Sequence, residues 1–358
     1  MTTPVPIRLY VNPAWQREGL YSPLLFPFWG NPTEAVSLFA KEMFDAHPFD
    51  TSAYTITADI QQADIVFAPY RHIWLLNHDT ALLAECSRVA QQAGLPLLVD
   101  GMGDIERPVD TPNTYVLRIG GYRFLPEQRR IQMPPAADDL LERCCGGEFS
   151  VREKQVGKPI VGFAGWAELS SWQTLRTVIK ELPIRMRGIF DSNYRAMKKG
   201  VLWRAKALAI LERSSLVKLN LKKRSSFSGS VRTAGKDMRA LRQDFVDTVL
   251  ASDYALDVRG DANDSTRLFE ILSLGRIPVL VDTERRLPFS DEVDYKEFCL
   301  IVDFRDINEL PERIAEFHKA VTPERFIDMQ RKARDAFVQN FRIDAQMKHI
   351  VRSLSAVL

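Results

Sequence analysis

The sequence lacks the features that mark secreted, metal-binding and membrane-spanning proteins. Four cysteines occur in 358 residues and none lies in a Cys-x-x-Cys pair, which argues against a disulfide framework and against a zinc site. No apolar run approaches the roughly 20 residues of a membrane-spanning helix, and no internal repeat or low-complexity tract is found. We therefore expect a cytoplasmic protein, either free or peripheral on the inner face of a membrane.

A strong excess of one charge is also missing, since the formal net charge is +2. Locally, however, Lys and Arg outnumber Asp and Glu roughly five to one over residues 185–242. This basic region is compatible with a solvated helix face, with a face beside a phosphate-bearing ligand or an anionic membrane, or with a nucleic-acid surface. Because no nucleic-acid-binding motif accompanies the charge, we expect no nucleic-acid partner.

What is present is an alternation of strand-like and helix-like segments, long enough for two domains. The expected strands are residues 7–11, QQADIVFAPY, LPLLVDG, YVLRI, IVGFAGW, PIRMRGIF, YALDV, IPVLV and CLIVDF. Such alternation is typical of parallel sheets. We predict an α/β protein with two Rossmann-like domains, residues 1–155 and 156–335, facing across a cleft. Residues 336–358 are expected to form a C-terminal helix that packs back on the first domain.

Residues 259–281 read RGDANDSTRLFEILSLGRIPVLV, a charged turn followed by a short helix and a buried strand. Asp264 or Ser265 suits the helix N-cap and Gly275 suits the C-cap. The N-terminus of such a helix offers free amide groups and the positive end of the helix dipole, which favour a phosphate.

Arg267 and Glu270 are three residues apart and therefore share one side of that helix. The planar guanidinium of Arg267 can hold a diphosphate, and Glu270 can accept hydrogen bonds from the hydroxyls of a ribose. These two residues predict a nucleotide-diphosphate site. The alternative is that they form an ion pair with each other and that Ser265 only caps the helix.

Residues 245–282 resemble the C-terminal signature of the exostosin family, glycosyltransferase family 47, through RGD, Ser265, Arg267, Glu270 and IPV. QQADIVFAPY and IQMPP resemble two further segments of that family. The resemblance implies a soluble, bacterial-style GT-B enzyme with an acceptor domain followed by a donor domain. It also implies a nucleotide-diphosphate sugar donor, preferably a UDP-sugar, inversion at the anomeric carbon, and no obligatory metal or other cofactor. The expected donor-binding residues are Arg259, Gly260, Asp264, Ser265, Arg267, Glu270, Arg187 and Arg224.

An inverting transferase needs a group that takes the proton of the acceptor hydroxyl. Four candidates follow expected strand ends, where open α/β sheets bind their ligands: Glu18, His72, Asp100 and Asp104. Each has a plain structural alternative, as a surface charge, a turn former or a buried polar group. Many exostosins have Gly-Arg-Asp-His-Phe where this chain has Asp-Gly-Met-Gly-Asp at residues 100–104, so the family's residues there are not carried over.

The acceptor implied by the resemblance is a glycan or lipid-linked glycan in cell-surface polysaccharide synthesis, with the basic region as a possible membrane contact. Two alternatives stay open. One is a fucosyltransferase-like GT-B enzyme that uses a GDP-sugar. The other is a catalytically silent GT-B homologue that binds a nucleotide or glycan as a scaffold, and turnover distinguishes it from an enzyme.

Overall fold

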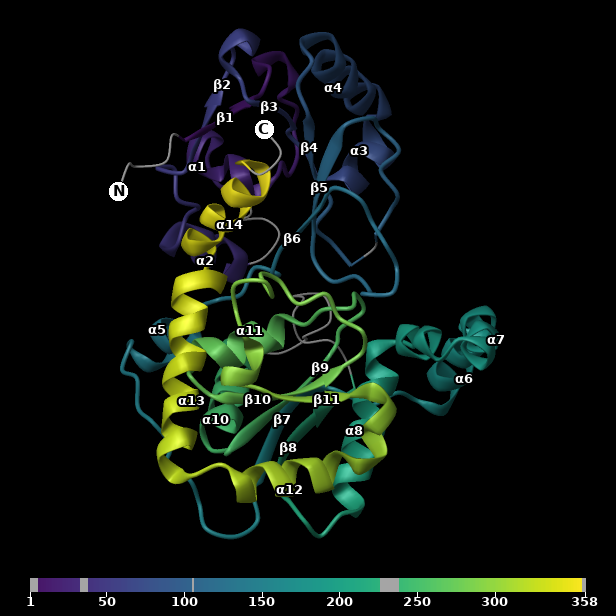
Figure 1. Ribbon diagram of the computed structural model, residues 1–358, viewed down its shortest axis with the longest axis vertical. Helices are drawn as coiled ribbons and strands as arrows, with labels where there is room; N and C mark the ends of the chain where they lie inside the picture. The colour runs from purple at the N-terminus through teal and green to yellow at the C-terminus, as the bar shows by residue number, and fades with distance from the viewer. Residues whose placement is uncertain (1–5, 33–37, 105, 226–237, 356–358) are drawn as a thin grey trace.

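Two parallel β-sheets, one above the other along the long axis of the molecule, organise the chain (Figure 1). The computed structural model describes residues 6–32, 38–104, 106–225 and 238–355. The first sheet is formed by strands of the N-terminal half and the second by strands that begin at Ile160. The predicted α/β architecture is confirmed. The segment between α5 and β7, where the sequence suggests a domain boundary, connects the two halves.

The first sheet has six parallel strands in the order β2-β1-β3-β4-β5-β6. The strands are β1 (Ile7–Tyr10), β2 (Tyr54–Thr57), β3 (Ile65–Ala68), β4 (Leu97–Asp100), β5 (Thr114–Arg118) and β6 (Arg130–Gln132). The helices of this half are α1 (Phe26–Trp29), α2 (Leu38–Ala46), α3 (His72–His78), α4 (Thr80–Ala93) and α5 (Leu140–Cys145).

The second sheet has five parallel strands in the order β11-β10-β9-β7-β8. The strands are β7 (Ile160–Trp166), β8 (Lys218–Arg224), β9 (Tyr254–Val258), β10 (Ile277–Asp282) and β11 (Leu300–Asp303). The helices are α6 (Ser171–Lys180), α7 (Leu182–Phe190), α8 (Gly200–Arg213), α10 (Met238–Leu250) and α11 (Thr266–Ser273). Both sheets have the strand order of a doubly wound fold, with a switch point beside the first strand of each.

Helices cover both faces of the second sheet, so its central strands are almost wholly apolar. Every residue of β9 and of β10 is buried. Trp203 and Leu208 of α8 pack on one face of the sheet, whereas Val246 and Val249 of α10 pack on the other. Gly275, with φ of +59°, lets the chain leave α11 and enter β10.

The C-terminal helices return the chain from the second half to the first (yellow in Figure 1). They are α12 (Leu310–Ala320), α13 (Pro323–Ala336), a π-helical turn (Phe337–Phe341) and α14 (Ile343–Ser355). Met347, Ile350 and Leu354 of α14 join the core of the first half. This crossing helix, together with the two doubly wound sheets, gives the chain a GT-B fold.

A direct backbone contact also joins the two halves. Tyr122 and Arg285 form an isolated antiparallel bridge, and the amide of Arg123 donates to the carbonyl of Glu284 at 2.9 Å. Arg123 also pairs with Asp282 at 2.8 Å. The loop after β5 is therefore fixed against the loop after β10, which sets the two sheets relative to each other.

The strand expected at PIRMRGIF is wrong, because these residues form helix α7. The alternation of Ile184, Arg185, Met186 and Arg187 suggests a strand, but Pro183 in the first turn favours a helix and the segment joins neither sheet. Sequence reasoning also missed the edge strands β2, β6 and β8. Among the described residues, no helix has the length and apolar character needed to cross a membrane.

Candidate functional site

A cavity of about 520 Å³ lies between the two halves of the molecule. From the second half it is lined by the ends of β7 and β8, by the turn after β9 and by α11. From the first half Asp104, Ile119 and Pro135 reach it, each from a segment that follows a strand. The carboxyl ends of both sheets therefore face one cavity, which is where doubly wound folds bind their ligands.

Arg267 on α11 presents a partly buried cation with unused hydrogen-bond donors at this cavity. Its guanidinium lies 4.5 Å from the ring centre of Phe163, and its Nη2 donates to the carbonyl of Ala164 at 3.2 Å. Its Nε and Nη1 are buried and have no hydrogen-bond partner. Burial lowers the pKa of Arg267, so an anion that supplies the missing acceptors would be strongly favoured here.

Glu270 lines the same cavity but does not pair with Arg267. Its carboxylate forms an ion pair with Arg242 of α10, and both side chains are mostly buried. The guanidinium of Arg242 also lies 4.8 Å from the ring centre of Phe39 in α2. Among the described residues, Arg267 and Glu270 form no ion pair with each other, so the structure does not support the ion-pair alternative.

The turn that starts α11 brings Asp264 and Ser265 to the cavity. Ser265 is the N-cap residue, but its side chain makes no capping hydrogen bond. Asp264 accepts from the Ser265 amide at 2.7 Å through Oδ1, while its buried Oδ2 has no partner. Burial raises the pKa of Asp264 to about 7, although the Ser265 amide and the charge of Arg285 act in the opposite direction.

Arg204 of α8 forms part of the cavity wall and ties the strand ends together. Its guanidinium donates to the carbonyl of Trp166 at 3.2 Å and to the carbonyl of Arg259 at 2.9 Å. Burial, followed by the charge of Arg267, lowers the pKa of Arg204 to about 9. The guanidinium groups of Arg204 and Arg267 are thus neighbours at this cavity.

Arg259 and Arg187 do not line this cavity. Arg259 is buried, and its guanidinium holds the turn after β9 through the carbonyls of Gly260, Asp261 and Ala262. Arg187 lies on α7, where its guanidinium is 5.8 Å from the ring centre of Tyr194. Gly260 and Arg224 do line the cavity.

Of the four candidate bases, Asp104 alone lines the large cavity. It also lines a second cavity of about 240 Å³, together with His72. Desolvation in the cleft raises the pKa of Asp104 and the charge of Asp261 raises it further, whereas Arg71 lowers it. Asp100 is fully buried and accepts from Ser22 Oγ at 2.6 Å. Glu18 is exposed and lines neither cavity.

Sequence reasoning missed Arg242 as the partner of Glu270 and did not expect Arg204 to line the cavity. Both belong to the basic region, so the local excess of positive charge could have pointed to these two residues. Other cations of this region have local partners, because Lys222 pairs with Asp244 at 2.6 Å and Lys223 with Glu212 at 2.7 Å. Residues 226–237 of the basic region lie outside the described residues.

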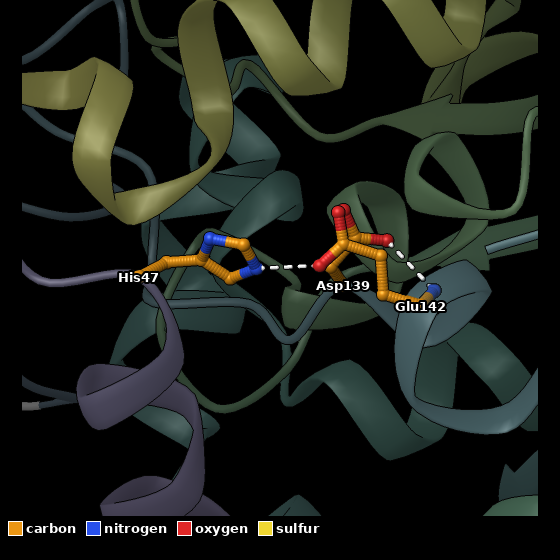
Figure 2. Close-up of side chains that lie close together, drawn as sticks. All are labelled: His47, Asp139 and Glu142. Carbon is orange, nitrogen blue, oxygen red and sulfur yellow. Dashed lines mark hydrogen bonds and ion pairs between the residues drawn. The ribbon is translucent and has the colours of Figure 1, made fainter. Parts of the chain in front are cut away.

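His47, Asp139 and Glu142 converge at the junction of α2 and α5 and have donor atoms suited to a metal ion (Figure 2). His47 Nε2 lies 2.8 Å from Glu142 Oε2. Arg334 binds both oxygens of Asp139, at 2.7 and 2.9 Å, and Arg342 lies 3.2 Å from Glu142. Since these arginines already supply the compensating charge, we interpret the cluster as an ion-pair joint between α5 and the C-terminal helices.

Residues 204–317 match the family model of the Exostosin GT47 domain. Over these residues the chain is similar to the exostosin family. The matched segment begins at Arg204 and contains α11, so it supplies most of the second-half wall of the cavity. The family named by the sequence resemblance is thereby confirmed for this segment.

Solved structures and curated proteins add little beyond this match. A crystal structure of TarM aligns at a TM-score of 0.30 and 10% identity, over 76% of this chain and 58% of TarM. A point mutant of S. aureus TarM, in complex with fondaparinux, α-GlcNAc-glycerol and UDP, aligns at 0.31 and 10%, over 76% and 59%. The chain therefore spans less than two thirds of TarM. No curated protein matches the sequence.

Proposed function

We propose that this protein is an inverting glycosyltransferase that uses a nucleotide-diphosphate sugar, preferably a UDP-sugar. The proposed acceptor is a glycan or lipid-linked glycan of a cell-surface polysaccharide, and no metal is required. One observation carries the proposal: two buried guanidinium nitrogens of Arg267, Nε and Nη1, have no hydrogen-bond acceptor, and they lie at a cavity where both sheets present their carboxyl ends. The exostosin domain supports the same conclusion.

In this proposal the donor diphosphate lies against the start of α11. Arg267 donates Nε–H and Nη1–H to phosphate oxygens, while Ser265 offers a hydroxyl that is not used for capping. The free amides of the first helical turn add to this anion site. Glu270, one turn further along α11, accepts from ribose hydroxyls, and its existing pair with Arg242 keeps it oriented.

Transfer requires that an acceptor oxygen attacks the anomeric carbon while the bond from that carbon to the phosphate oxygen breaks. We assign Asp104 as the base that takes the proton of the acceptor hydroxyl, because it faces the cavity from the first half. The electron pair of the broken bond passes to the leaving diphosphate. Arg267 then stabilises the added charge, so no metal has to do so.

A calorimetric screen of UDP-, GDP-, CDP-, ADP- and dTDP-sugars, with EDTA and with added Mg²⁺, tests the donor site. Tight binding of one UDP-sugar in EDTA is the expected result. A preference for a GDP-sugar would favour the fucosyltransferase-like alternative. Absence of binding in every mixture would reject the donor site.

Turnover needs a separate test because a silent homologue could still bind the donor. With the donor found by calorimetry, transfer to alkyl glycosides is followed by mass spectrometry, and the anomeric configuration by NMR. Asp104→Asn should reduce transfer at least a hundredfold and leave donor binding unchanged. Donor binding by the parent protein without any transfer would favour the scaffold alternative.

A further inference from the structure

Helices α6 and α7 form a hairpin, residues 171–190, that stands away from both sheets (Figure 1). Helix α6 has no buried residue, and in α7 Gly188 is the buried one. Of the eleven exposed large apolar side chains among the described residues, seven lie on this hairpin. Single exposed apolar residues are ordinary, but such a concentration marks an interaction surface.

The apolar side chains form a stripe on each helix. On α6 they are Trp172, Leu175 and Ile179, which are spaced three and four residues apart. Trp172 is 71% exposed and Ile179 is 62% exposed. The helix begins with a capping box between Ser170 and Gln173. This cap stabilises the start of the helix even though none of its residues is buried.

On α7 the exposed apolar residues are Leu182, Met186, Ile189 and Phe190, at helical positions i, i+4, i+7 and i+8. Phe190 is 91% exposed. Transfer of a side chain of this size out of water is favourable in free energy. No neighbouring element of the described chain covers it.

The charges of the hairpin are almost all positive. Arg176, Lys180, Arg185 and Arg187 lie on it, and Glu181 is its one acidic residue. The carboxylate of Glu181 is buried and accepts from Arg185 at 3.0 Å. The surface thus combines exposed apolar side chains with an excess of positive charge.

We propose that the α6–α7 hairpin docks on an anionic lipid surface. Its apolar side chains would enter the boundary between head groups and acyl chains, while its Arg and Lys side chains contact the anionic head groups. Charge complementarity selects this occupant over a second copy of the chain. A symmetric dimer through the hairpin would bring equal positive charges together, at a cost in binding free energy.

The hairpin lies close to the cleft, since α6 begins five residues after Trp166, which ends β7 and lines the large cavity. Lys199, nine residues after the hairpin, lies over the Trp166 ring at 5.3 Å. The hairpin precedes the matched exostosin domain, residues 204–317. Docking is independent of the proposed transfer reaction, but it would hold the cleft beside acceptors that are anchored in a membrane.

Sedimentation of the full chain with lipid vesicles tests the proposal. Vesicles of phosphatidylcholine with about one third phosphatidylglycerol should bind the protein at least tenfold more tightly than pure phosphatidylcholine vesicles. Higher salt should weaken this binding, because the basic side chains contribute to it. Failure to bind either kind of vesicle would overturn the proposal, whatever the outcome of the donor screen.

Variants connect vesicle binding to the hairpin itself. The double variant W172A/F190A should lose at least tenfold in vesicle affinity, while V156A, at a fully exposed apolar residue outside the hairpin, should keep it. Circular dichroism checks that the variants are folded. Unchanged binding by W172A/F190A would overturn the proposal. The proposal would also be overturned if the parent protein does not bind vesicles but forms a dimer that W172A/F190A cannot form.

Discussion

The guanidinium of Arg267 occupies the space into which a side chain at Gly165 would extend. A Cβ at residue 165 would overlap Arg267 Nη2, and Gly165 has a φ of +152°, a conformation that favours glycine. Gly165 lies within β7 and Arg267 on α11, so a residue without a side chain in the strand makes room for the cation on the helix.

Gly165→Ala should therefore displace Arg267 and weaken UDP-sugar binding by roughly tenfold or more. Calorimetry measures the dissociation constant. Gly30→Ala is the matched control, because Gly30 also has a positive φ, +90°, but nothing lies near its missing Cβ. Equal affinity of G165A and the parent protein would show that Arg267 does not need this space.

Glu270→Ala should weaken UDP-sugar binding by about 1.5 to 3 kcal/mol, because charge-assisted hydrogen bonds to the ribose would be lost. Binding of the free sugar phosphate, which has no ribose, should be unaffected by the change. Gln243→Ala, on the exposed side of α10, serves as a control. If the variant binds UDP-sugars as the parent does, Glu270 has no role in recognising the ribose.

The protonation of Asp264 should make donor binding dependent on pH. Its raised pKa of about 7 means that the carboxyl is neutral in mildly acidic solution and negative above neutrality. A UDP-sugar diphosphate keeps its charge over this range, so affinity should fall as the pH rises from 6 to 8. Asp264→Asn should remove most of that dependence, and an unchanged pH profile in this variant would contradict the assignment.

The carboxyl group of Asp264 should also make the stability of the protein depend on pH. Because the pKa of Asp264 is raised in the folded state, the folded protein retains the proton at pH values where the unfolded chain has lost it. Its contribution to the free energy of unfolding should therefore decrease between about pH 4 and pH 7. Urea titrations at pH 5 and pH 8 measure the trend, and Asp264→Asn should show a smaller difference than the parent protein.

Asp257 and Arg285 form a fully buried ion pair at 2.6 Å in the second half. Arg285→Met should lower the free energy of unfolding by about 3 to 5 kcal/mol, because Asp257 would be left buried without a partner. The double variant D257L/R285M should recover much of the loss, as urea titration can measure. A double variant as unstable as R285M would show that the pair is not the cause.

The part of the cavity wall formed by α11 could be predicted from the sequence because it is local in the chain. Asp264, Ser265, Arg267 and Glu270 lie in one turn and one short helix, and a repeating helical geometry is enough to bring them together. The partners of these residues could not be predicted in the same way. Arg242 reaches Glu270 from a helix 28 residues earlier, and only the packed fold determines this contact.

The first-half wall depends on how the two sheets face each other. Asp100 ends β4 and Asp104 lies four residues further on, yet Asp100 is buried with a hydrogen bond from Ser22 and Asp104 lines the cavity. Their spacing in the sequence does not distinguish these positions. The strand predicted at α7 was wrong for a related reason. Its apolar and charged residues alternate in the sequence, but the segment packs against no sheet, so this alternation does not correspond to a buried and an exposed face of a strand.

The most direct measurement of the central claim is a calorimetric titration of a UDP-sugar into Arg267→Ala in EDTA. Arg213→Ala, at an exposed arginine of α8, is the matched control. We predict that R267A loses between about tenfold and about a hundredfold in affinity while R213A binds as the parent protein does. Equal affinities in all three proteins would contradict the donor site at α11 and, with it, the proposed function.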